Sequence, residues 1–114
     1  MNKKTLILNQ ISAFVKKDFD IDHVPPNITE EEILDFLNRF IYDLIDNDLK
    51  RLFYLLYRLD INEQKVHNAL SPKSEQAPHK AIAKLIFLRE KQKAVSRIEY
   101  SEQNIEEDGD GWQS

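Results

Sequence analysis

The chain of 114 residues has no cysteine. This excludes disulfides, thiolate metal sites and a cysteine nucleophile, and we expect a cytoplasmic protein. The only glycines, Gly109 and Gly111, lie near the C-terminus. The rest of the chain therefore lacks glycine-rich phosphate loops and the glycines that tight hairpin turns favour.

No stretch approaches the roughly 20 apolar residues that cross a bilayer. Polar residues interrupt the apolar start of the chain, so we expect a helix of the mature protein there.

Hydrophobic residues make up 41% of the chain, too many for a wholly disordered protein. They recur at helical spacing in blocks that prolines separate. The pattern predicts a first helix ending near Lys17, helical segments over 30–59 and 61–70, and a last helix from Pro78 to near Ile98. We therefore predict an all-α fold, a single-domain bundle of four or five helices over residues 1–98. A disordered acidic C-terminal tail is expected over residues 99–114.

Several helix starts can be predicted from capping residues. Thr29 and Glu32 have the spacing of a capping box, in which side chain and backbone exchange hydrogen bonds. Asp60 and Glu63 repeat this spacing before the short helix. The sequence "DND" at 46–48 contains three poor helix formers, and Asn47 is the expected cap of a new helix. A break at this place decides between four helices and five.

The acidic stretch 18–32 resembles a calcium loop, because aspartates occupy its first, third and fifth positions. An EF-hand loop also needs a glycine at position 6 and a glutamate at position 12, where this chain has His23 and Thr29. We therefore expect no metal site. The stretch is interpreted as a solvated connection from which Phe19 and Ile21 reach the core.

Catalytic motifs are not apparent. The three histidines lie in different predicted elements, and none has the i, i+4 spacing of a helical zinc site. No serine stands in a nucleophile motif. Two carboxylates brought together by the fold would be needed for an acid–base enzyme, and no pair is singled out. We expect a non-catalytic protein without a cofactor.

Charge is distributed unevenly along the chain. Residues 18–48 carry ten acids and one base, whereas residues 80–97 carry six bases and one acid. Arg89, Lys93 and Arg97 are spaced i, i+4, i+8 and form a basic stripe on the last helix. The stripe either pairs with acids of the 30–48 helix or of the tail, or binds phosphates. We favour the pairing, because the net charge is −4 and no aromatic residue interleaves with the stripe.

The C-terminal segment has six acids and no base between residues 99 and 110, followed by Trp112, the only tryptophan. Such a segment is either a motif that docks into a groove, in its own chain or in a partner, or a solubilising end. We favour the solubilising end.

The segment 49–63 has apolar residues on nearly every side of its helix. Either this helix is central in the bundle, which we favour, or one side faces another subunit. Tyr54, Tyr57 and Arg58 are residue types that interfaces favour. Its sequence "LLYRLDINE" is similar to one found in short bacterial proteins that are all helical. The resemblance covers residues 30–98 and implies no activity.

These observations predict a small interaction or regulatory module whose partner is another protein or a second copy of the chain, as in a homodimer. The candidate binding residues are Tyr54, Tyr57, Arg58, Arg89, Lys93, Arg97 and Trp112. The alternative is a nucleic-acid binder that uses the basic stripe of the last helix.

Overall fold

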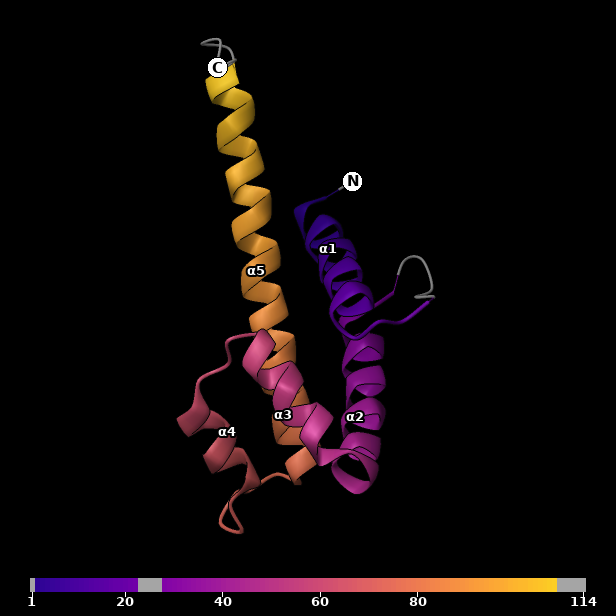
Figure 1. Cartoon of the computed structure of the whole chain (residues 1–114). Helices are drawn as coiled ribbons and strands as arrows, with labels where there is room; N and C mark the ends of the chain where they lie inside the picture. Colours follow the sequence, from indigo (N-terminus) through magenta and orange to yellow (C-terminus); the bar gives the residue numbers. More distant parts are fainter. Residues whose placement is uncertain (1, 23–27, 109–114) are drawn as a thin grey trace.

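The computed structural model describes residues 2–22 and 28–108, with the side chains of the last helix as far as Glu102. These residues form five α-helices and no strand (Figure 1). The helices are α1 (Lys3–Asp18), α2 (Glu30–Asn47), α3 (Leu49–Arg58), α4 (Glu63–Leu70) and α5 (Pro78–Asp108). The predicted all-α bundle is confirmed. Within the described ranges, no helix combines the length and apolar character that crossing a membrane requires.

The predicted capping box of α2 is confirmed. The Glu32 backbone N–H donates to Thr29 Oγ1 at 3.1 Å, and the Thr29 backbone N–H donates to Glu32 Oε1 at 3.0 Å. This return bond from Thr29 lowers the pKa of Glu32. Three glutamates lie in the first turn of α2, where the positive end of the helix dipole favours them.

The predicted break between α2 and α3 is confirmed, but its cap is different. Asp48 caps α3, and its Oδ1 accepts a hydrogen bond from the Arg51 N–H at 3.1 Å. Asn47 remains in α2, where its side-chain amide donates to Asp43 Oδ1 at 2.8 Å. Because Asp48 also ends α2, this one residue separates the two helices.

The prediction that Asp60 caps α4 is wrong. Asp60 adopts a left-handed conformation, with φ of 57°, and takes part in the turn that ends α3. In this turn the Asp60 N–H donates to the Tyr57 carbonyl at 3.0 Å, and the Ile61 N–H donates to the Leu56 carbonyl at 3.2 Å. An N-cap residue typically has an extended backbone, which the left-handed Asp60 lacks, and Asn62 caps α4 instead.

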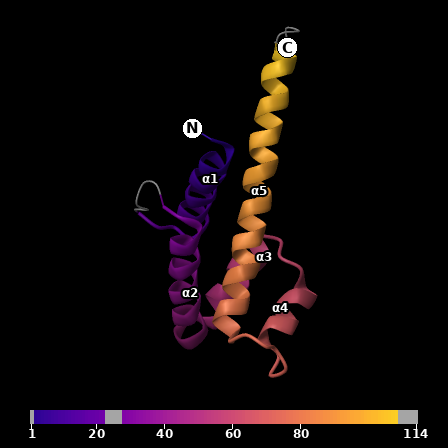
Figure 2. The ribbon, with the colours of Figure 1, turned by 180° about the vertical axis from the view of Figure 1, so that it is seen from behind.

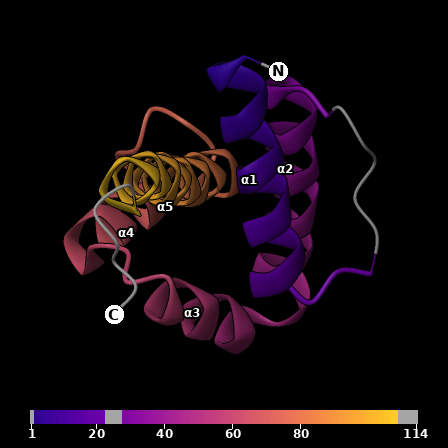
Figure 3. The same ribbon diagram turned by 90° about the horizontal axis from the view of Figure 1, so that it is seen from above.

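The central helix is α5, whereas the sequence favoured α3. Helices α1, α2 and α4 all pack against α5, while α3 packs mainly against α2. Seen from above, α1 and α2 lie on one side of α5 and α4 lies on the other (Figure 3). The core contains mostly aliphatic side chains from every helix: Ile11, Val15, Phe19, Ile33, Leu37, Ile41, Leu44, Leu52, Leu55, Leu56, Leu59, Val66, Ala69, Ile82, Ala83, Ile86, Phe87 and Ala94.

The connection after α1 agrees in part with the prediction. Phe19 is buried, and Ile21 is partly buried against the core. Asp20 between them adopts positive φ, and this turns the chain out of the helix. His23, on which the comparison with a calcium loop partly depended, lies outside the described residues.

Helix α5 is 31 residues long, or about 46 Å at ~1.5 Å per residue. It continues to Asp108, beyond the end expected near Ile98. No glycine precedes residue 109, so no strong helix breaker ends α5 earlier. Its last turns extend past the other helices (Figure 2). Trp112 lies outside the described residues.

Candidate interaction surface

Apolar side chains of helix α3 extend beyond the side that faces the core. Leu52, Leu55, Leu56 and Leu59 are buried on that side. Four large side chains next to it are exposed to solvent: Leu49, Phe53, Tyr54 and Tyr57. Together with Arg58 we call these residues the α3 outer face. An exposed group of large apolar side chains on one helix is typical of a binding surface.

Three of the predicted binding residues therefore lie together. Tyr54 is 58% exposed and Tyr57 is 81% exposed. The Arg58 guanidinium lies 5.8 Å from the centre of the Tyr54 ring, a distance typical of a cation–π contact. Leu49 and Phe53 were not among the binding residues predicted from the sequence. They belong to the outer face because positions 49, 53 and 57 recur every four residues along α3.

A groove between α3 and α4 adjoins the outer face. Its volume is about 530 Å³, and Phe53 and Tyr57 line it from α3 while Val66 and Leu70 line it from α4. Leu56 and Ile61 add further apolar surface, and the polar lining includes Asp60, Glu63 and His67. The groove offers the outer face a recess that an apolar side chain of a partner can enter.

The basic stripe has mainly structural contacts. Arg89 donates from Nε to the Leu59 carbonyl at 2.8 Å and from Nη1 to Gln92 Oε1 at 3.1 Å. The first bond satisfies a carbonyl at the C-terminal end of α3. It thereby joins α5 to the turn between α3 and α4. Arg97 is exposed, whereas Arg89 and Lys93 are partly buried. The three residues therefore do not form one continuous exposed surface.

Lys93 joins α5 to α1. Its Nζ lies 3.0 Å from Asp18 Oδ2 and 2.9 Å from Glu90 Oε1, and 4.8 Å from the centre of the Phe14 ring. Burial favours a lower pKa for Lys93, but its contacts with the Glu90 and Asp18 carboxylates prevail and raise it. The stripe was expected to pair with acids of the 30–48 helix or of the tail. The acids it meets instead belong to α1 and to α5 itself.

Glu90 is a buried charged residue that the sequence reasoning missed. Its side chain is 0% exposed, and among the described residues neither of its oxygens has a well-directed hydrogen bond, although Oε1 is close to Lys93. Burial raises the pKa of Glu90 to about 7, and neighbouring Asp18 adds to the rise while Lys93 opposes it. The sequence contains an indication of this burial. Glu90 lies four residues from both Ile86 and Ala94 and thus on the same side of α5, and both of these residues are buried.

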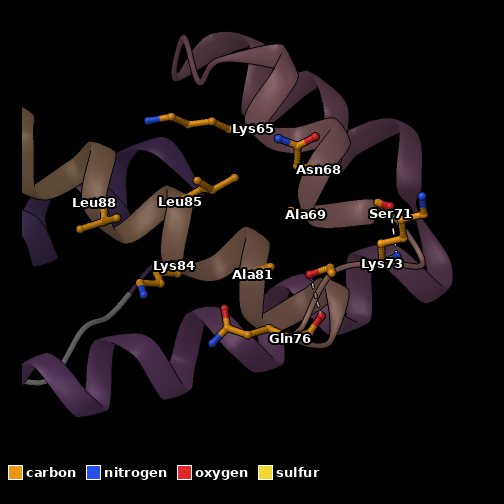
Figure 4. A pocket seen from close by; sticks show the side chains of 11 residues that line it. Lys65, Asn68, Ala69, Ser71, Lys73, Gln76, Ala81, Lys84, Leu85 and Leu88 are labelled. Carbon is orange, nitrogen blue, oxygen red and sulfur yellow. Dashed lines mark hydrogen bonds between the residues drawn. The ribbon is translucent and has the colours of Figure 1, made fainter.

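A second groove lies between α4 and α5, with a volume of about 600 Å³. The described residues that line it include Lys65, Lys73 and Lys84 and no acid, and Leu85 and Leu88 contribute apolar surface. The ammonium groups of the three lysines point in different directions (Figure 4). They do not converge on one point, so the groove lacks the geometry of a compact anion site.

No family model, curated protein or solved structure matches the chain. The resemblance of residues 30–98 to short bacterial helical proteins stays a prediction. Inference about function therefore depends on the surfaces described above.

Proposed function

We propose that this protein is a small non-catalytic interaction module that binds a protein partner through the α3 outer face. The observation that carries the proposal is the exposure of four large apolar side chains on one side of α3. Phenylalanine and tyrosine of this kind are enriched at the centres of protein interfaces. The lack of cysteine supports a cytoplasmic site of action.

The composition of the face suits binding. Tyr54 and Tyr57 have few rotatable bonds, so fixing them on binding costs little entropy, and both present a ring and a hydroxyl to a partner. Arg58 adds a charged, planar group beside Tyr54. Clusters of tyrosine and arginine often carry most of the binding energy of an interface.

Contacts within the bundle support a protein partner over a nucleic acid. A phosphate-binding stripe would need Arg89 and Lys93 to point into solvent, whereas Arg89 bonds to a carbonyl and Lys93 to two carboxylates. Such binding would also weaken steeply with added salt. Association through the apolar α3 outer face would depend much less on salt.

Photo-cross-linking in the native cell tests the proposal. The photoreactive residue benzoylphenylalanine replaces Tyr57 in one variant and Tyr42 in a matched control. Tyr42 is also well exposed, at 61%, but it lies on α2, where its ring contacts that of His79. We expect a discrete protein adduct from position 57 and only background from position 42.

The same experiment can refute the proposal. Background labelling from both positions would mean that the α3 outer face meets no protein partner. Equal labelling from both would mean that exposure alone, and not the character of the face, determines contact.

A further inference from the structure

The far end of α5 differs in charge from the rest of the helix. Residues 98–108 contain Glu99, Glu102, Glu106, Glu107 and Asp108 and no base. We call residues 98–108 the acidic α5 end. Its backbone continues as helix beyond the top of the bundle (Figures 1 and 2). One ion pair, between Lys3 Nζ and Glu102 at 3.5 Å, links this end to α1, and both side chains are more than half exposed. An exposed pair of this kind contributes little to stability.

Helix α3 has the opposite charge. Its charged residues are Lys50, Arg51 and Arg58, with no acid between residues 49 and 58. All three are exposed, and positions 50, 54 and 58 recur at i, i+4 spacing, so basic groups flank the aromatic side chains. The partner of this face therefore needs acidic groups next to its apolar surface.

Charge disfavours the simplest symmetric contact, in which the α3 outer faces of two copies meet. Such a contact would bring Lys50, Arg51 and Arg58 of one copy close to the same residues of the other, and like charges across an interface are unfavourable. The acidic α5 end supplies the complementary charge. Asp60 and Glu63 lie at the groove with α4, so we expect the acids of the segment to lie nearer to Arg51 and Arg58 than to the groove.

The acidic α5 end cannot reach α3 of its own chain. Arg89 bonds to the Leu59 carbonyl, so the C-terminal end of α3 lies beside residue 89 of α5. Residue 98 is nine residues further along a continuous helix, or about 13 Å away at ~1.5 Å per residue. The segment that complements α3 must therefore come from another molecule.

We infer that this molecule is a second copy of the chain. In the dimer, the acidic α5 end of each copy lies along the α3 outer face of the other, and the two copies run antiparallel. A two-fold axis makes both contacts at once, because α3 and the acidic end lie at different levels along α5 (Figure 1). The inference depends on the proposed function, since it names the partner of the α3 outer face.

A charge exchange tests the inference. The first variant makes α3 acidic through Lys50→Glu, Arg51→Glu and Arg58→Glu. The second makes the end of α5 basic through Glu99→Lys, Glu102→Lys, Glu106→Lys and Glu107→Lys. Neither set alters a side chain known to be buried, and far-UV circular dichroism checks that both variants fold. The assay is molar mass from light scattering across a concentration series.

We expect the wild-type chain to show a mass twice its 13.5 kDa. Each variant alone should show a twofold lower mass, because its α3 and its α5 end then carry the same sign. An equimolar mixture of the two variants should return to the dimer mass, since both contacts are complementary again.

A wild-type chain that stays monomeric would overturn the dimer but not the proposed function, which the cross-link at position 57 tests separately. Variants that still dimerise alone, or a mixture that remains monomeric, would equally overturn the assigned contact. An adduct from position 57 to a different protein, combined with a monomeric chain, would leave the α3 outer face as a binding surface for that protein.

Discussion

Replacing Glu90 by glutamine tests the contact between α1 and α5. The substitution keeps the shape of the side chain and removes a charge that is shielded from water. The acid that faces Glu90 from α1 is Asp18, and the base next to it on α5 is Lys93. Glutamine imitates the protonated carboxyl group. The variant should therefore be about as stable as wild type at low pH and more stable than wild type at high pH.

The direction of the effect follows from the pKa of Glu90, which burial raises from its usual 4.5 to about 7. Between these values the folded chain holds a proton that the unfolded chain has released. The stability that this proton contributes is complete below pH 4.5 and is lost as the pH rises through 7. A pKa rise of this size corresponds to about 3 kcal/mol in the free energy of unfolding.

Urea denaturation of wild type and of Glu90→Gln, followed by circular dichroism across this pH range, measures the effect. We expect the variant to gain about 3 kcal/mol over wild type as the pH rises, because glutamine cannot ionise. Glu102→Gln, on the exposed part of the same helix, is the control that removes a carboxylate without removing a buried charge. Parallel stability curves for wild type and Glu90→Gln would refute the reasoning.

Other substitutions test the remaining contacts, each by denaturant unfolding. Thr29→Ala removes the capping box and should cost about 1 kcal/mol; no loss would mean that the cap does not stabilise α2. Lys93→Met leaves Glu90 without its cation and should cost about 2 kcal/mol at pH 8, and it should cost clearly less when residue 90 is already glutamine. An equal loss from Lys93→Met in both backgrounds would contradict the pairing. Tyr57→Ser should change stability by less than about 0.5 kcal/mol, whereas Leu56→Ala beside it should cost about 2 to 5 kcal/mol. A large loss from Tyr57→Ser would mean that this residue belongs to the core.

Features fixed by neighbouring residues could be predicted from the sequence. The helical spacing of apolar residues is sufficient to predict four or five helices, and the capping box depends only on Thr29 and Glu32. Caps were misplaced where the backbone conformation of a turn decides which residue caps the next helix. Asp60 has the right side chain to cap α4, but its backbone is left-handed in the turn that ends α3.

The identity of the central helix could not be predicted. Helix α3 is apolar on two sides, and the sequence does not say which side the rest of the bundle covers. The answer depends on α5, which is long enough to pack against three helices at once. The α3 outer face remains exposed because α5 and not α3 occupies the centre.

The role of the basic stripe depends on contacts between distant parts of the chain. Lys93 meets Asp18, 75 residues away in sequence, and Arg89 meets the Leu59 carbonyl, 30 residues away. Spacing along α5 places the basic residues on one side of a helix but does not show what faces them. The exposed tyrosines were easier to identify, because their residue types alone suggested an interface.

The most direct test of the claim that α3 presents a binding surface is hydroxyl-radical footprinting of the tyrosines. Reactivity of Tyr54, Tyr57 and Tyr42 is measured in the native cell and in the dilute purified chain, where all three rings are well exposed. We predict that Tyr54 and Tyr57 become protected in the cell while Tyr42 does not change. Equal reactivity of all three in both settings would contradict the claim.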